Sequence, residues 1–340
     1  MIKRAFILLS LMLACVTLLA QALTTHATTP TPAPSKTPTP FPTATLPPTN
    51  TPAATATIIP SNTAALEAFT QGDLSVLTGN VQRPNGITWI NDRLYIACTG
   101  DSSIYEIEAA NGSTILYIFG LANAHMLYAE TDADNELNIW APDFERNLLI
   151  RIRRVGLITV TDEGLNGPWG IAYLDDESFL VTNILDNNVV RVTRDGQVSE
   201  FLSGLRSPTG MAVDEEGYIY VANNGSARRA IEWTTRAPET NVANEAQPLV
   251  SGLQNVTNVV MASDGYLYFA YSLGTRGLVG RVDPAQCRAE GGCTNDQVEI
   301  VLYSELPAPL AGLTISPDLR LFVHTIYRPE IYWVQLDQRP

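Results

Sequence analysis

The sequence predicts an all-β protein in which residues 65–340 form a single six-bladed β-propeller. Three observations predict this fold: six similar segments, a spacing between them that suits propeller blades, and a missing last strand that the start of the region can supply. Before this region, we expect a signal peptide at residues 1–22 and a disordered Thr/Pro-rich linker at residues 23–64.

Each of the six segments consists of an apolar strand, an acidic or glycine turn, a second apolar strand, a polar loop and a third strand. Their first strands begin near six aligned positions: Gly86, Met126, Gly170, Gly210, Val259 and Gly312. These positions lie 40, 44, 40, 49 and 53 residues apart, which is typical of propeller blades. The pairs Glu216-Gly217 and Asp264-Gly265 are typical of the hairpin turns between such strands.

The two ends of this region predict how the ring closes. The last repeat reaches its third strand at Tyr332–Val334 and leaves only residues 337–340 after it, too few for a fourth strand. An apolar strand near Leu74–Leu77 precedes the first repeat and belongs to none of the six. We expect these two strands to pair, because closing the ring removes the last exposed sheet edge.

The residues before position 65 have the composition of a signal peptide followed by a linker. A positive start and the apolar stretch 5–20 end at Ala20-Gln21-Ala22, which matches a signal-peptidase site. A lipoprotein signal at Cys15 and an uncleaved membrane anchor are the alternatives. Residues 23–64 repeat Thr and Pro with almost no large apolar side chains, so they cannot bury enough surface to fold. A secreted or cell-surface location follows.

Charge excludes several classes of partner. All 35 acidic residues follow position 65, where the basic residues are 18 arginines, so this part has a formal net charge of −17. Nucleic acid and anionic membranes are poor partners for such a surface, which has no basic stripe. No lysine follows Lys36, and this excludes Schiff-base chemistry in the folded part.

The cysteines predict one local disulfide. Cys287 and Cys293 flank a short glycine-containing loop in an exported chain, which favours a bond between them; two free thiols are the alternative. Cys98 lies in an apolar run and is expected to be a buried strand residue without catalytic function.

Three segments, PNGITW, SPTGMAVDEEGYIYVAN and VTNVVMASDGYLYFA, resemble the repeats of the NHL, gluconolactonase-type (senescence-marker) and streptogramin-lyase-like propellers. The resemblance extends over all six blades. It implies that the loops entering the first strands and those following the second strands share one face. It also implies a divalent metal at the channel mouth in gluconolactonases, and histidine, acidic groups and a metal in the lyases.

Carried onto this chain, the resemblance gives a set of candidate ligand-binding residues at the channel mouth and in the neighbouring loops: Asn85, His125, Trp169, Thr209, Asn258, Asp101 and Asp186. Asn85 and Asn258 are the candidate metal ligands, and His125 is the candidate catalytic base. The alternative for His125 is a structural role, in which its side chain forms a hydrogen bond with the carbonyl of a neighbouring loop. The acidic partners of a metal site do not align, because Trp169 and Thr209 stand in two of the positions. Two neutral amides hold a hard cation poorly.

Two functions therefore remain open. The first is an exported, tethered binding module that uses the loop face around the channel for a small molecule, a glycan or an extracellular protein. The second is a metal-dependent lactone or ester hydrolase or lyase, with a divalent cation as its cofactor. In either case we expect a monomer.

Overall fold

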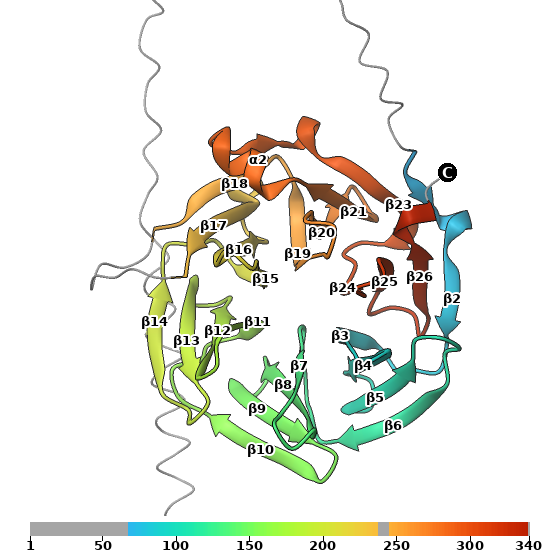
Figure 1. Cartoon of the computed structure of the whole chain (residues 1–340), viewed down its shortest axis with the longest axis vertical. Coiled ribbons are helices and arrows are strands. Elements are labelled where there is room, and N and C mark those ends of the chain that lie inside the picture. Colours follow the sequence, from blue (N-terminus) through green and yellow to red (C-terminus); the bar gives the residue numbers. More distant parts are fainter. Residues whose placement is uncertain (1–66, 237–244, 339–340) are drawn as a thin grey trace, which may run out of the picture. The chain divides into compact units, whose positions relative to one another are not determined.

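The computed structural model describes residues 67–236 and 245–338, so the predicted signal peptide and linker lie outside the described residues. The described residues form six antiparallel sheets, which are arranged radially around a central axis as propeller blades (Figure 1). The predicted six-bladed propeller is confirmed.

Blades 1 to 3 each contain four strands, in sequence order from the channel to the rim. Blade 1 has β3 (Pro84–Ile90), β4 (Arg93–Cys98), β5 (Ser103–Glu108) and β6 (Thr114–Phe119). Blade 2 has β7 (Tyr128–Thr131), β8 (Leu137–Asp143), β9 (Leu148–Arg153) and β10 (Gly156–Thr161). Blade 3 has β11 (Pro168–Asp175), β12 (Ser178–Asn183), β13 (Asn188–Thr193) and β14 (Val198–Leu202).

Blades 4 and 5 each gain a short fifth strand at the rim, paired in parallel. Blade 4 has β15 (Pro208–Val213), β16 (Tyr218–Asn223), β17 (Ile231–Thr235), β18 (Gln247–Ser251) and the added β22 (Cys293–Thr294). Blade 5 has β19 (Gln254–Met261), β20 (Leu267–Leu273), β21 (Arg276–Val282), β23 (Glu299–Pro307) and the added β1 (Phe69–Thr70). The helical turns are η1 (Gln71–Asp73), η2 (Ala227–Arg229), α2 (Pro284–Ala289), η3 (Asn295–Gln297) and η4 (Leu336–Gln338).

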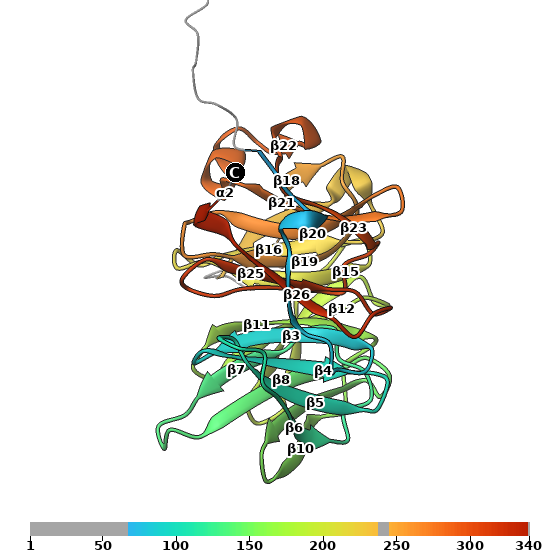
Figure 2. The same cartoon turned by 90° about the vertical axis from the view of Figure 1, so that its right-hand side faces the viewer.

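Blade 6 joins the two ends of the described chain. Its strands are β24 (Gly312–Ile315), β25 (Arg320–His324), β26 (Ile331–Gln335) and β2 (Ser75–Thr78). Val76 pairs with Tyr332, and β2 lies beside β26 in both views (Figures 1 and 2). The predicted ring closure is confirmed, within one residue of the predicted strand.

The core lies between the blades, because alternate side chains of each strand face the neighbouring sheets. Large side chains such as Tyr220, Phe179 and Phe322 have no exposed surface. Cys98 is a free, buried thiol, as the sequence predicted, and burial raises its pKa to about 12. Such a thiol does not ionise near neutral pH and is a poor nucleophile.

The hairpin turns follow the chemistry that their sequences predict. Gly217 and Gly265 adopt φ values of 88° and 82°, a region open mainly to glycine. The acidic residue Asp132, at the corresponding turn of blade 2, accepts hydrogen bonds from the backbone amides of Asp134 and Glu136. It also forms an ion pair with Arg153, so this turn is held by its own contacts.

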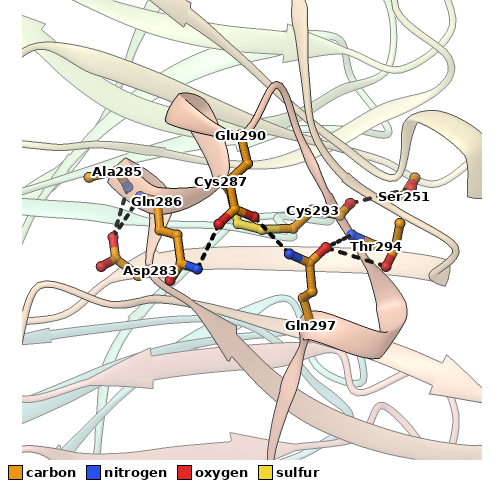
Figure 3. The surroundings of a disulfide bond; sticks show 9 residues. All are labelled: Ser251, Asp283, Ala285, Gln286, Cys287, Glu290, Cys293, Thr294 and Gln297. Atoms are coloured by element: carbon orange, nitrogen blue, oxygen red, sulfur yellow. Dashed lines mark hydrogen bonds between the residues drawn. A yellow bond between two sulfur atoms is a disulfide. The ribbon is translucent and has the colours of Figure 1, made fainter. Parts of the chain in front are cut away.

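The predicted disulfide between Cys287 and Cys293 is confirmed (Figure 3). Asp283 begins α2 by accepting hydrogen bonds from the amides of Ala285 and Gln286. The disulfide then ties α2 to β22, the strand that extends blade 4. A connection inside blade 5 therefore closes the outer edge of its neighbour.

Candidate functional site

The inner strands enclose a central cavity of about 370 Å³. All six inner strands contribute to its wall, through largely apolar residues such as Ile87, Ile171, Met211 and Leu313. The six predicted repeats therefore do share one channel. None of the predicted mouth residues belongs to the lining of this cavity.

Three of the predicted mouth residues form hydrogen bonds between neighbouring blades. The amide of Asn85 donates to Oδ1 of Asn123, at the entrance to blade 2, over 2.6 Å. The hydroxyl of Thr209 donates to the carbonyl of Val256, before blade 5, over 2.8 Å. The side chains of Asn85 and Thr209 are buried, and so is that of Asn258, the third residue; none is more than 3 % exposed.

Asn258 donates to the carbonyl of Ala311 at the entrance to blade 6, over 2.9 Å. Its position corrects the alignment of blade 5 by one residue. In the first hairpin of blade 4, Met211 pairs with Val221, and in that of blade 5, Val259 pairs with Phe269. Val259 is therefore equivalent to Met211. Thr257 therefore stands where blade 4 has Thr209, and its hydroxyl forms the same kind of bond, to the carbonyl of Leu310.

His125 and Trp169 meet across the seam between blades 2 and 3. Their rings are parallel within 4° and their centroids are 3.4 Å apart, which is a close stack. Phe144 contacts both rings edge-on, with centroid distances of 5.4 Å to His125 and 5.9 Å to Trp169. The predicted alternative for His125, a hydrogen bond to a loop carbonyl, is replaced by this aromatic cluster.

Burial lowers the pKa of His125 to about 3. The imidazole is neutral at physiological pH, but it is a weak base because its conjugate acid forms only in strong acid. General-base catalysis is most efficient when the pKa of the base lies near the working pH. His125 is better suited to present an aromatic surface than to remove a proton.

The two predicted acidic residues lie in loops that follow second strands. Oδ2 of Asp101 accepts a hydrogen bond from the Tyr105 hydroxyl over 2.5 Å, within blade 1. Asp186 is exposed, and Oδ1 accepts a hydrogen bond from the Asn166 amide over 2.6 Å. Each carboxylate therefore has a local partner.

A repeated structural role of polar residues was missed in the sequence. The last residue of the second strand in blades 2, 3 and 4 is Asp143, Asn183 or Asn223, and each is buried. Each accepts a hydrogen bond from a backbone amide of the loop that enters the same blade, at Ala122, Asn166 and Arg206 respectively. Their recurrence after an apolar strand was the available signal.

Two further ring-bearing residues, His324 and Trp233, belong to strands. His324 has no exposed surface, and its ring lies directly over Gly312. A Cβ atom at Gly312 would lie 2.0 Å from Nε2 of His324, so only glycine fits there. Trp233 belongs to strand β17 and pairs with Tyr220.

The residues at the mouth do not suit a divalent cation. Within residues 67–236 and 245–338, no three His, Cys, Asp or Glu side chains come together as a group that could hold a metal. Asn85 and Asn258 offer amide oxygens only. A hard cation requires several oxygen ligands, usually with carboxylates among them.

The loop face carries exposed apolar side chains. Two of them lie in loops after second strands: Leu185 in blade 3, which is 60 % exposed, and Tyr327 in blade 6, which is 62 % exposed. The third, Leu273, is the last residue of the second strand of blade 5 and is 55 % exposed. Single exposed apolar residues are common, but three of them on the loops of one face form a candidate interaction surface.

Comparison with solved structures agrees with this architecture. A gluconolactonase from Xanthomonas campestris matches at 16 % identity with a TM-score of 0.59, over 80 % of this chain and 92 % of its own. A streptogramin B lyase matches at 15 % identity with a TM-score of 0.56, over 76 % and 96 %. This chain shares their propeller fold.

A chain of the nidogen–laminin complex also matches, at 15 % identity with a TM-score of 0.51, over 65 % of this chain and 84 % of its own. No family model matches the sequence, and no curated protein matches it. At these identities the likeness shows the fold alone. The resemblance inferred from the repeats is confirmed at that level.

Within the described residues, no helix has the length and hydropathy needed to cross a membrane. The predicted signal and anchor segments fall outside those residues.

Proposed function

We propose that this chain is an exported binding module whose loop face contacts an extracellular protein. The observation that carries the proposal is the exposure of Leu185, Leu273 and Tyr327 on the loops of three blades. Protein interfaces are enriched in aromatic residues at positions that lose water on binding. Tyr327 is an exposed aromatic residue of this kind on this face.

Charge limits the partner further. The folded part carries 35 acidic residues against 18 arginines, so a partner with a neutral or basic surface associates more readily than an acidic one. The fold likeness to a chain of the nidogen–laminin complex is compatible with a propeller that serves in an assembly of proteins.

The enzymatic alternative receives less support from the residues present. It needs a metal beside Asn85 and Asn258 and a base at His125. The two amide groups donate to other blades, and His125 has a pKa of about 3. The carboxylates of Asp101 and Asp186 are each engaged by a local partner.

Photo-crosslinking in the producing cell tests the binding proposal. A photoreactive residue at Leu185 or Tyr327 is expected to give the same discrete protein adduct, because both belong to one face. Glu177, in the exposed turn after the first strand of blade 3, serves as the control on the opposite face. The proposal is wrong if neither loop position gives an adduct, or if Glu177 gives the same one.

A further inference from the structure

The outer edges of the six blades are protected unequally. In blade 4 the edge is covered by β22, and in blade 5 it is covered by β1. In blade 3 the outer strand β14 carries the exposed charge of Glu200. Added strands and charges are the usual means by which proteins prevent sheet edges from pairing with other chains.

Within the described residues, blade 1 has neither form of protection. Its outer strand β6 has the sequence Thr-Ile-Leu-Tyr-Ile-Phe, and no described strand pairs with its outer edge. Ile115, Leu116 and Phe119 are 48 %, 38 % and 60 % exposed. This strand contains no charge and no proline, and its β-branched and aromatic residues favour strand pairing.

The apolar surface continues onto both neighbouring blades. Thr114, at the start of β6, shares a hydrogen bond of 2.8 Å with Thr78 of β2. Gly120, just after β6, lies against Leu157 of β10, since a Cβ placed there would be 3.6 Å from that side chain. The three outer strands follow one another along the rim (Figure 1).

Exposed apolar residues accompany all three strands. We call the following set the apolar rim: Val76, Ile115, Leu116, Phe119, Val155 and Ile158. Val76 is 57 % exposed on β2, and Ile158 is 55 % exposed on β10. More than half of the exposed large apolar residues in the described chain belong to this set.

We propose that the apolar rim is a dimer interface at which β6 pairs with β6 of a second copy of this chain. Antiparallel pairing about a two-fold axis places the same uncharged strand opposite itself, so no like charges meet at its centre. The folded part has a formal net charge of −17, so two copies repel each other overall. The residues of β6 themselves add no charge to that repulsion.

The molecule itself shows that its blades accept additional strands. β1 and β22 each add two residues in parallel to an outer edge, and each buries one apolar side chain, Phe69 or Cys293. Strand addition at blade 1 extends the same arrangement to a free edge, between molecules. The proposal replaces the monomer expected from the sequence and does not depend on the function of the loop face.

Sedimentation equilibrium of the protein, purified as its host produces it, tests the proposal. We expect a concentration-dependent dimer that becomes tighter at high salt, because salt screens the repulsion between two acidic molecules. Phe119→Glu is expected to weaken the dimer by more than about tenfold, since it places a charge in the paired strand. Leu273→Glu, equally exposed on the loop face, is the matched control and should leave the dimer unchanged.

A second measurement covers the case in which Phe119→Glu folds poorly. Leu116→Cys, one of the exposed positions at the centre of β6, is expected to form a disulfide-linked dimer under mild oxidation. Leu273→Cys should not form one. A protein that stays monomeric at every concentration and salt, with no crosslink through residue 116, overturns the proposal. Equal effects of the rim and loop-face substitutions also overturn it.

Discussion

The hydroxyl of Thr209 reaches across a blade boundary and donates to the carbonyl of Val256. Thr257 forms the same bond to Leu310 across the next boundary. Both threonines are buried, and both stand at the aligned position where we expected ligand-binding groups. These aligned positions therefore connect neighbouring blades.

Removing one of these bonds should lower stability. Thr209→Val keeps the side-chain shape but leaves the carbonyl of Val256 without this donor. We expect a loss of about 1–3 kcal/mol in the free energy of unfolding, the cost of a buried unpaired polar group. Chemical denaturation measures it. Thr209→Ser retains the hydroxyl and should lose clearly less; an equal loss in both variants contradicts the assignment.

The disulfide should contribute through the short loop that it closes. Replacing both Cys287 and Cys293 by serine is expected to lower the free energy of unfolding by about 2 kcal/mol, from the chain entropy of so short a loop. Hydrogen exchange should increase first in β22, which the bond ties to α2. Unchanged exchange in β22 would show that the strand does not depend on the bond.

Acid should destabilise the fold through its two buried histidines. Burial lowers the pKa of His125 to about 3 and of His324 to about 4, so both stay neutral in the folded protein while the unfolded chain takes up protons below about pH 6.5. The free energy of unfolding should therefore fall as pH drops from 6.5 towards 4.5. Each histidine contributes up to about 1.4 kcal/mol per pH unit.

Denaturation of a His125→Phe variant isolates one of the two contributions. This substitution retains an aromatic ring beside Trp169 and removes the titrating group. The loss of stability between pH 6.5 and 4.5 should become about half as steep. An unchanged slope would show that His125 is not neutral in the folded state.

Removal of divalent metals should have no effect. Because the described mouth residues lack a carboxylate group suited to a cation, the melting temperature should be the same with EDTA, calcium, manganese or zinc. A melting temperature that rises with one metal in the unaltered protein would favour the hydrolase instead.

The architecture could be predicted because each blade repeats a local pattern that its own residues determine. The closure by β2 could also be predicted, since a chain with one strand too few at its end and one too many at its start has few ways to pair them. The alignment failed only in blade 5. There Asn258 stands where blade 4 has Gly210, one residue before the predicted position Val259.

The roles of the mouth residues could not be read in the same way. Whether Asn85 faces a ligand or the next blade depends on contacts between repeats, and these follow from the twist and tilt of whole sheets. His125 and Trp169 are separated by 44 residues in the sequence, and no local sequence pattern predicts that their rings stack. The exposed edge of β6 could not be predicted either, because the sequence does not show which blades β1 and β22 extend.

The most direct test of a binding rather than catalytic role at the mouth is an NMR titration of His125, assigned by comparison with His125→Phe. A ring stacked on Trp169 and shielded from water should show no protonation between pH 8 and pH 4.5. A midpoint between pH 6 and 7 would contradict this, because His125 would then be an accessible base poised for proton transfer.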